Sequence, residues 1–424
     1  MATSHHTFPG DIDVRKAELL FYGAQQTLNI IPNIISFTVV ENILAPTVLV
    51  TIQFADTLGI RNHMAISGGE ELFLSWKTPA MGEYNNFHGI LYTLDNRKVE
   101  TNVETFTMSF VSMEKYRNDT TTLSKYYNGT HTNIAKKVWA DGMPKEQPAL
   151  EVIDSSNINT GLVVPNWRPM YTIQWLLSRC SDPIDLLFFQ TIDGHTIRSL
   201  TQMFRGPVAF EYKRDINPQT ANDKFFSVSN PPENLTEPFF QDMISGALAS
   251  RTIEHDVLHK SFSTFDYQYQ NQFDPETKLN RFPVYPNSLQ PSSATALNYL
   301  AETRPFDGIY DPIAKTAPRR LSEFSILMHR RIQINVPGNS ELRCGQIINY
   351  HPQSIEPPTN NQAKDFRSSG RWLITGIQHH LNIHRYSCVL ELARDSQPNR
   401  TADSKVLIID KNRKSAVETN KAIP

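Results

Sequence analysis

The strongest constraint on the fold is the alternation of hydroxyl and apolar side chains over residues 105–110 of TFTMSFVS (105–112). The two alternating sets are Phe106, Met108 and Phe110, and Thr105, Thr107 and Ser109. A period of two sends successive side chains to opposite faces of a β-strand, so one face can pack on a core while the other meets water. LAPTVLVTIQFADT (44–57), EELFLSW (70–76) and HGILYTL (88–94) are similar. The first hundred residues are therefore predicted to be β-structure.

The segment after residue 116 has a mixed pattern. THTNIAKKVWADGM predicts a short helix with Thr132 as its cap and Gly142 as its stop. PMYTIQWLLSRCSDP predicts a second, amphipathic helix that begins at Pro169 and ends before Pro183. DLLFFQTIDGHTIRSL predicts a hairpin closed around Asp193 and Gly194. Together these patterns indicate an α+β domain.

Strands are predicted to return in GPVAFEYKRD and DKFFSVSN, followed by a helix in PFFQDMISGALASRT. Residues 251–317 are rich in Pro, Tyr, Phe, Asn and Gln without long periodicity, which favours an irregular insertion on a surface. RRLSEFSILMHRR predicts a helix with Leu321, Phe324, Leu327 and Met328 inward.

Two β-rich regions share one order of features: a glycine turn, a strand, a loop, and a hairpin whose second arm alternates. GGEELFLSWKTP, HGILYTL and TFTMSFVS are echoed by CGQIINYHP, SGRWLITGIQHHL and YSCVLELARD. The similarity indicates either a duplicated barrel-like domain or a chance likeness between two β-meanders. The candidate turn residues that set strand register are Gly68, Gly69, Gly89, Pro337, Gly338, Gly345, Gly370 and Gly376.

The charge distribution is uneven along the chain, although the net charge is only −2. Residues 1–115 carry 7 Lys/Arg against 12 Asp/Glu, whereas residues 318–414 carry 15 against 8. The small net charge does not indicate a nucleic-acid or membrane-surface binder. Cys180, Cys344 and Cys388 lie in apolar or strand-like segments, which favours buried reduced thiols. No signal peptide and no apolar stretch long enough to span a membrane are visible, so no membrane insertion is expected.

Histidine groups are the features closest to a catalytic or metal site. His379 and His380 would point to opposite faces of a strand, with His384 nearby, and His255 and His259 would share a helix face without the glutamate of a zinc protease. No nucleophile elbow, phosphate loop or dinucleotide fingerprint is present. We therefore expect no enzyme, no catalytic, cofactor-binding or metal-binding residues, and no cofactor.

The order of three stretches resembles the baseplate hub subunits of contractile-tailed bacteriophages, a family that also supplies the N-terminal hub part of secretion-system spike proteins. The stretches span roughly residues 35–395. They are ENILAPTVLVTIQFADTLGI with ISGGEELFLSW, VVPNWRPMYTIQWLLSRC with LLFFQTIDGHTIRSL, and VPGNSELRCGQIINYHP with SGRWLITGIQHHLNIHRYSCVLELARD.

The resemblance implies a β-rich α+β fold with two similar β-barrel tube domains, a mixed α+β domain and an irregular inserted domain. The implied boundaries are 1–115 for the first tube domain, 116–206 for the α+β domain, 207–250 with 318–397 for the second tube domain, 251–317 for the inserted peripheral domain and 398–424 for a C-terminal tail.

The resemblance also implies a homotrimer whose six tube domains form a pseudo-sixfold ring between the sixfold tail tube and the threefold spike. The acidic first copy and the basic second copy would alternate around this ring. Thr105, Thr107 and Ser109 are candidates for lining its channel, although the same residues could face outward.

The implied partners are a second and third copy of the chain, a central spike protein, a tail tube or tube-initiator protein, a tape-measure protein and baseplate wedge proteins, with DNA only in transit. The implied location is the virion tail baseplate, assembled in the host bacterial cytoplasm. Two alternatives remain: a tail-associated enzyme, either a peptidoglycan hydrolase or a metalloprotein, and the hub of a tailocin or secretion system.

Overall fold

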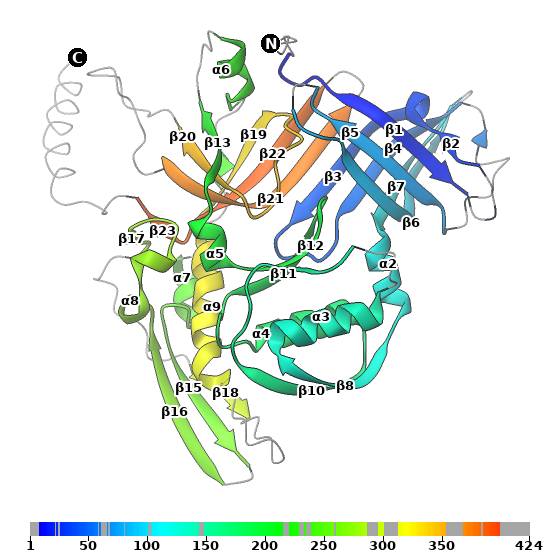
Figure 1. The fold of residues 1–424 in the computed structure, drawn as a ribbon. Coiled ribbons are helices and arrows are strands. Elements are labelled where there is room, and N and C mark those ends of the chain that lie inside the picture. Colours follow the sequence, from blue (N-terminus) through cyan, green and yellow to red (C-terminus); the bar gives the residue numbers. More distant parts are fainter. Residues whose placement is uncertain are drawn as a thin grey trace, which may run out of the picture.

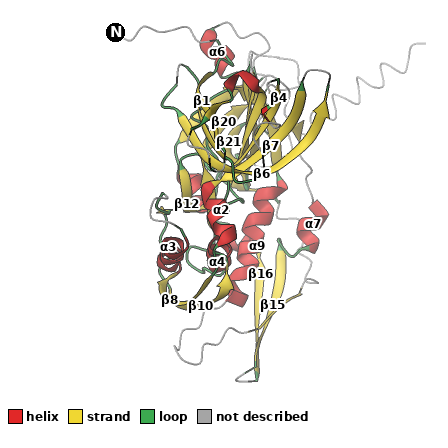
Figure 2. Ribbon diagram, turned by 90° about the vertical axis from the view of Figure 1, so that its right-hand side faces the viewer, coloured by secondary structure: helices red, strands yellow, loops and turns green. Residues whose placement is uncertain are grey.

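The computed structural model shows a β-rich α+β fold in which a large twisted sheet lies at one end of the molecule (Figure 1). The described residues are 8–21, 23, 26–57, 59–60, 66, 68–79, 81–100, 103–143, 148–214, 220–228, 233–234, 239–257, 260–285, 296–300, 313–352, 368–382 and 385–398. Most helices and the hairpin of β15 (Ala249–Asp256) and β16 (Ser261–Gln268) lie toward the opposite end, whereas α6 (Ala221–Phe225) lies at the same end as the sheet (Figure 2).

Six strands from the N-terminal region form what we call the first unit. They are β1 (Asp13–Leu20), β3 (Ile34–Asn42), β4 (Leu49–Asp56), β5 (Glu71–Lys77), β6 (Asn85–Val99) and β7 (Glu104–Ser112). Their order in the sheet is β3-β4-β7-β6-β5-β1, and the short β2 (Leu28–Asn29) extends it beyond β1. A 3₁₀ turn, η1 (Ile31–Asn33), leads into β3.

Six strands from the C-terminal half form the second unit. They are β13 (Val208–Lys213), β14 (Glu233–Asn234), β19 (Arg331–Pro337), β20 (Ile347–His351), β21 (Gly370–Asn382) and β22 (Tyr386–Ala393). Their order, β14-β19-β22-β21-β20-β13, repeats the topology of the first unit strand for strand. One difference is that β13 pairs with β20 in parallel, whereas β1 pairs with β5 antiparallel.

The two long strands of the units share a bulge. On β6 the register with β7 shifts between Leu91 and Thr93, and on β21 the register with β22 shifts between Ile374 and Gly376. In both units the residue that precedes the bulge donates its backbone N–H to a residue just before the preceding strand. Leu91 donates to the Glu70 carbonyl at 2.8 Å, and Ile374 donates to the Gln346 carbonyl at 3.0 Å. A bulge bends and twists the strand that carries it, so both long strands bend at the same place.

The two units join into one thirteen-stranded sheet where β3 pairs with the second half of β21. The first half of β21, up to Leu373, pairs with β20 instead. The described strands run as one open sheet from β14 to β2 and show no closed barrel, so the expected pair of barrels is not found in this part of the chain.

The sheet forms where the alternation of side chains predicts it. Val50, Ile52 and Phe54 of β4 are at most 1% exposed, and Phe106, Met108 and Phe110 of β7 are at most 2% exposed, because both strands turn these residues toward one core. That core continues into the second unit through Ile334, Leu390 and Leu392. One hydrophobic core therefore spans both units.

An α+β segment lies between the two units in sequence and has a core of its own. It contains α2 (Met113–Thr120), β8 (Leu123–Thr130), α3 (His131–Gly142), β9 (Glu151–Val152), β10 (Asn159–Trp167), α4 (Pro169–Ser178), β11 (Leu186–Thr191), β12 (Gly194–Ser199) and α5 (Leu200–Arg205). The helix at Pro169 and the hairpin at Asp193–Gly194 are confirmed. The expected cap at Thr132 is wrong: Thr130 Oγ1 accepts the Asn133 N–H and caps α3.

The DKFFSVSN strand prediction is wrong, because residues 221–225 form the helix α6 (Ala221–Phe225). Thr220 and Asp223 explain the error, since the Asp223 carboxylate accepts the Thr220 N–H and the Thr220 hydroxyl accepts the Asp223 N–H. This reciprocal capping outweighs the strand propensity of Phe225 and Phe226. Within the described part of this stretch, residues 223–228, Ser227 makes the one isolated β-bridge, with Lys213.

The region expected to be irregular contains regular elements. The elements that lie within or overlap residues 251–317 are β15 (Ala249–Asp256), β16 (Ser261–Gln268), α8 (Tyr269–Gln272), η2 (Pro275–Thr277), β17 (Phe282–Pro283), β18 (Ala296–Leu300) and α9 (Ile313–His329), and β17 pairs with β23 (Ser396–Gln397). The helix α7 (Phe239–Ile244) precedes this region. The order β16-β15-β18 forms a separate three-stranded sheet. The predicted helix in PFFQDMISGALASRT is therefore too long, and α9 begins earlier than expected. On α9 Leu327 is fully buried, whereas Leu321, Phe324 and Met328 are half-buried.

A search of the helices in the described residues finds none that is long and apolar enough to cross a bilayer.

Candidate functional site: the polar face of the sheet

The face of the sheet opposite the core is polar along β7. Thr105, Thr107 and Ser109 are half-buried on that face, directly opposite the side that turns Phe106, Met108 and Phe110 inward. The sequence pattern therefore places the three predicted channel-lining candidates on a single surface of one strand.

This polar surface continues across both units as a row of residues in register. Paired positions on neighbouring strands run, from β6 to β22, through Thr93, Ser109, Thr51, Thr38, His380 and Ser387. The Thr38 hydroxyl and His380 Nδ1 lie 3.1 Å apart at the junction of the units. The row therefore crosses from the first unit into the second without interruption.

A second row lies beside the first and runs through Asp95, Thr107, Gln53, Ser36 and Asn382. The Ser36 hydroxyl donates to Gln53 Oε1 at 3.1 Å, which ties two of these side chains together. Asp95 is the one carboxylate in the two rows, and neither row contains Lys or Arg. Such a surface has hydrogen-bonding groups but no basic girdle that would bind phosphates.

The predicted turn residues lie around the ends and bulges of the strands. Positive φ angles are found at Gly68 (+89°), Gly69 (+104°), Gly345 (+82°) and Gly370 (+117°). Pro337 is the last residue of β19 and Gly338 follows it, where a Cβ atom would lie 2.1 Å from the Tyr386 ring. Gly89 lies within β6 and Gly376 lies at the bulge of β21.

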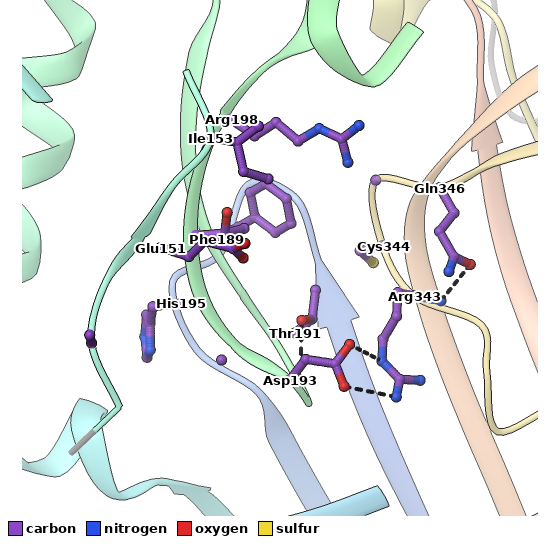
Figure 3. A pocket seen from close by; sticks show the side chains of 14 residues that line it. Glu151, Ile153, Phe189, Thr191, Asp193, His195, Arg198, Arg343, Cys344 and Gln346 are labelled. Carbon is purple, nitrogen blue, oxygen red and sulfur yellow. Dashed lines mark hydrogen bonds and ion pairs between the residues drawn. The ribbon is translucent and has the colours of Figure 1, made fainter. Parts of the chain in front are cut away.

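A pocket of about 250 Å³ lies where the β11–β12 hairpin meets the second unit (Figure 3). At its mouth the Arg343 guanidinium forms a two-point ion pair with Asp193, with Nε at 2.8 Å from Oδ2 and Nη2 at 3.0 Å from Oδ1. Arg343 Nη2 also donates to Asn85 Oδ1 at 2.7 Å. One side chain therefore connects the first unit, the α+β segment and the second unit.

Glu41 lies beneath this ion pair and is 1% exposed. Its carboxylate accepts the backbone N–H groups of Ile192 at 2.8 Å and of Cys344 at 3.2 Å. Burial raises the pKa of Glu41 to about 7, although nearby Arg343 opposes the shift. Removal from water disfavours the charged form, and this outweighs the two hydrogen bonds and the guanidinium.

Sequence reasoning missed Glu41 and Arg343 as a pair, although the sequence carries a signal for Glu41. On β3 the residues Phe37 and Val39 face the core, and Glu41 continues the same period of two. A carboxylate at a core position requires partners, which the structure supplies from positions 192 and 344. The partners could not be found from the sequence because they are 151 and 303 residues away.

The histidine groups take structural positions. His379 is 1% exposed, with Nδ1 at 2.8 Å from the Tyr386 hydroxyl, and burial lowers its pKa to about 3. His380 lies on the other face, as predicted, and His384 lies outside the described residues. His255 lies on strand β15 and not on the expected helix, while His259 is outside the described residues.

Among the residues that the structure describes, no group of three or more His, Cys, Asp or Glu side chains could hold a metal ion. All three cysteines are buried and free.

Comparison with solved structures defines the class of fold. The chain is similar to a tail protein from Neisseria meningitidis MC58, with a TM-score of 0.57, 9% identity and coverage of 90% of this chain and 99% of that one. It is equally similar to the 43 kDa tail protein of prophage MuSo2 from Shewanella oneidensis, with a TM-score of 0.57, 10% identity and coverage of 90% and 98%. At such low identity these structures show the fold alone, which this chain shares with both tail proteins.

A sequence relative gives the more particular resemblance. The chain is 23% identical over 317 residues to "Probable baseplate hub protein gp334" of Vibrio phage KVP40, covering 67% of this chain and 72% of that protein. No protein-family model matches the chain. The resemblance to phage baseplate hub proteins, which the sequence indicates, is therefore confirmed.

Proposed function

We propose that this chain is the hub subunit of a contractile phage baseplate, in which three copies form a pseudo-sixfold ring between a sixfold tail tube and a threefold spike. The first and second units would be the two tube modules of each chain. Three chains would thereby present six similar units around one axis.

The observation that carries this proposal is the repeated topology. Both units order six strands identically, and both bend their longest strand at an equivalent bulge. A chain with two similar modules can match a sixfold partner through six contacts and a threefold partner through three chains. The likeness to a baseplate hub protein supports the same conclusion.

The polar rows across the sheet support a channel-lining role for this face. Hydroxyl and amide side chains allow water to remain between the wall and a passing chain, and a surface without Lys or Arg would not retain DNA phosphates. Thr107 and Ser109 belong to these rows, and Thr105, which pairs with Lys98, lies at their border. We propose that this face lines the lumen through which a tape-measure protein and then DNA pass.

The role is mechanical, and the proposed partners follow from it: a spike protein, a tail tube or tube-initiator protein, the tape measure and wedge proteins. The acidic N-terminal region and the basic C-terminal region would alternate around the ring and attract one another at each contact. The virion baseplate is the expected location, after assembly in the bacterial cytoplasm.

The mass of the full-length chain in solution tests the proposal, because a trimer has three times the 48.4 kDa of the chain. Light scattering coupled to size exclusion should report this trimer, alone or after addition of the spike protein encoded with it. A chain that stays monomeric under both conditions contradicts the ring. Cryo-electron microscopy of a tail tip should place the polar rows toward the axis, and peptidoglycan zymography should be negative.

A further inference from the structure

A second cavity, of about 400 Å³, lies where the first unit and the start of α2 meet the tip of the β11–β12 hairpin. Its volume is typical of sites that bind small ligands. The apolar side chains that line it are those of Val48, Phe87, Met113, Pro148 and Ile192, and the titratable ones are those of His88, Glu114 and Asp193. We call it the Glu114 cavity. It combines an apolar wall with a few polar groups, as ligand sites do.

Glu114 is the deeply buried charged group of this cavity. It lies in the first turn of α2, directly after β7, and is 8% exposed. Its Oε2 accepts a hydrogen bond from Gln190 Nε2 at 3.3 Å. Gln190 Oε1 in turn accepts the Val48 N–H at 3.0 Å, so the amide is held in this orientation. Within the described ranges, Glu114 Oε1 accepts no hydrogen bond and Glu114 forms no ion pair.

The other two titratable side chains of the cavity have partners elsewhere. His88 Nε2 lies 2.8 Å from Glu71 Oε2, and the His88 ring stacks on Phe73 with ring centroids 4.4 Å apart. Asp193 forms the ion pair with Arg343 that is described above. Of the charges that line this cavity in the described part of the chain, the carboxylate of Glu114 is therefore the one without a counter-charge.

The N-terminus of α2 gives this carboxylate some compensation, because an acidic side chain in the first turn of a helix interacts favourably with the helix dipole. Water can also solvate a carboxylate in a polar cavity of this size. Neither supplies the opposite charge that a buried carboxylate ordinarily has in a folded protein. The arrangement is that of a cation site in which the positive group has to come from outside the described residues.

We propose that the Glu114 cavity receives the ammonium or guanidinium group of a Lys or Arg side chain. The cationic group would pair with Glu114, and the methylene stem would lie along the apolar wall, as the stems of Lys and Arg do at other apolar surfaces. This proposal goes beyond the hub role and does not depend on the ring.

Such a side chain has two possible sources, a partner protein and the C-terminal segment of this chain. Residues 399–424 lie outside the described part of the chain and carry three Asp/Glu against six Lys/Arg, which are Arg400, Lys405, Lys411, Arg413, Lys414 and Lys421. Both sources present the same chemistry to Glu114, so the experiment has to identify the site first and the source second.

Titration of the full-length protein with Nα-acetyl-arginine amide and Nα-acetyl-lysine amide, followed by ligand-observed NMR, tests the site. At least one of the two should bind, whereas Nα-acetyl-norleucine amide, which has an apolar stem without the charge, should not. Glu114→Gln should weaken binding by about tenfold or more, because an amide provides no charge for the cation. Glu83→Gln, which removes an exposed carboxylate of the first unit outside the cavity, is the matched control and should bind as the wild type does. Equal binding by Glu114→Gln and the wild type overturns the proposal.

The unfolding temperature separates binding from a purely structural role of Glu114. Without ligand, Glu114→Gln should unfold at a temperature no lower than the wild type, because the substitution removes an unpaired buried charge and keeps an oxygen that can accept from Gln190. The arginine or lysine amide should raise the unfolding temperature of the wild type and leave that of Glu114→Gln unchanged. A variant that is less stable than the wild type and still binds the amides contradicts a cation site.

A tail variant identifies the source. In the full-length chain, Gln replaces all six Lys and Arg residues of 399–424. If this segment fills the cavity, the tail variant should bind the amides severalfold more tightly than the wild type, because an internal competitor is lost. If a partner protein supplies the cation, the two proteins should bind equally. Failure of both proteins to bind either amide overturns the site, and leaves the ring untouched because binding is measured on the chain in any oligomeric state.

Discussion

The first and second units have the same topology but bury their long strands differently. The second half of β21 is sandwiched between β22 and β3 and reads GIQHHLN, whereas the corresponding part of β6 reads TLDNRKV and is largely exposed. The difference teaches that topology alone does not determine the chemistry of a strand. The covered stretch contains no Asp, Glu, Lys or Arg, whereas the open stretch contains Asp95, Arg97 and Lys98, and such charges keep an open strand edge from pairing at random.

The position just before the two bulges gives a sharper contrast. The first unit has Gly89 there and the second unit has Trp372, which is fully buried. Trp372 Nε1 donates to the Ser368 carbonyl at 3.0 Å, and the Arg394 guanidinium lies 4.3 Å from the ring centroid. At Gly89 a Cβ atom would lie 2.4 Å from the Val111 carbonyl oxygen. At this equivalent position the space is filled by the Trp372 side chain in the second unit and by the neighbouring backbone of Val111 in the first unit.

The largest expected effect is that of Trp372→Ala. Removing a buried indole leaves a cavity and should lower the free energy of unfolding by about 3–5 kcal/mol. Because one core spans both units, chemical denaturation should still show both units unfolding together. Tyr92→Ala, at a 65% exposed side chain of the first unit, is the control and should change stability little. Unfolding of the second unit at a lower denaturant concentration than the first would show that the two units do not unfold cooperatively.

Glu41→Gln tests the link between the units by pH. The pKa of Glu41 is raised from 4.5 to about 7 in the folded state, so between these values the unfolded state ionises while the folded state stays protonated. Stability should therefore fall by about 3 kcal/mol in total as pH rises from 4.5 to 7, and Glu41→Gln should remove this part of the slope.

Denaturant titrations of both proteins between pH 4.5 and 8 measure this difference. Glu100→Gln, at an exposed position, is the control and should retain the slope of the wild type. Identical slopes for Glu41→Gln and the wild type would show that Glu41 ionises normally in the folded protein.

Gly89→Ala should destabilise the first unit by about 1–3 kcal/mol, because the added methyl group meets the backbone of Val111 and the ring of Phe87. Gly376→Ala in the second unit is the matched control. A Cβ atom there lies at ordinary contact distance, 3.4 Å from Glu391 Cβ. Thermal unfolding that shifts equally for both variants would contradict the contrast between the units.

The smallest expected effect is that of Asp193→Asn, which weakens the ion pair with Arg343 at the edge of the second unit. Asp193 is 67% exposed, so water screens the pair and the loss should be below about 1 kcal/mol. The negative charge of Asp193 also helps to raise the pKa of Glu41 in the folded state, so the pH dependence described for Glu41 should end at a lower pH in this variant. An unchanged pH profile would show that the two carboxylates act independently.

The strands of both units could be predicted from the sequence because their alternation reflects local burial. The inner face of β7 can be identified from its own sequence, because its apolar residues Phe106, Met108 and Phe110 are the buried ones. The repeat could be found from the sequence for the same reason, since β5–β7 and β20–β22 share one order of glycine turn, strand, loop and hairpin. What could not be predicted were features set by distant contacts, including the β3–β21 junction and the partners of Glu41.

The errors have different physical origins. At Thr220 and Asp223 a reciprocal cap decides for a helix where the apolar residues favour a strand. The strands β15 and β18 pair in parallel, and the paired residues Arg251 and Ala296 are 45 residues apart in the sequence. The local sequence pattern therefore gives little indication of this pairing. Thr130 rather than Thr132 caps α3 because the chain enters the helix directly from β8.

The position of the insertion has a consequence for assembly. Between β3 and β4 the first unit has only residues 43–48, whereas the equivalent connection of the second unit, from β14 to β19, carries α7, α9 and the three-stranded sheet β16-β15-β18. In a ring of three chains, appendages would decorate every other unit. The outer rim would then carry three docking points, whereas the inner wall would repeat six times. The different lengths of the β3–β4 and β14–β19 connections would therefore account for the change from sixfold to threefold order.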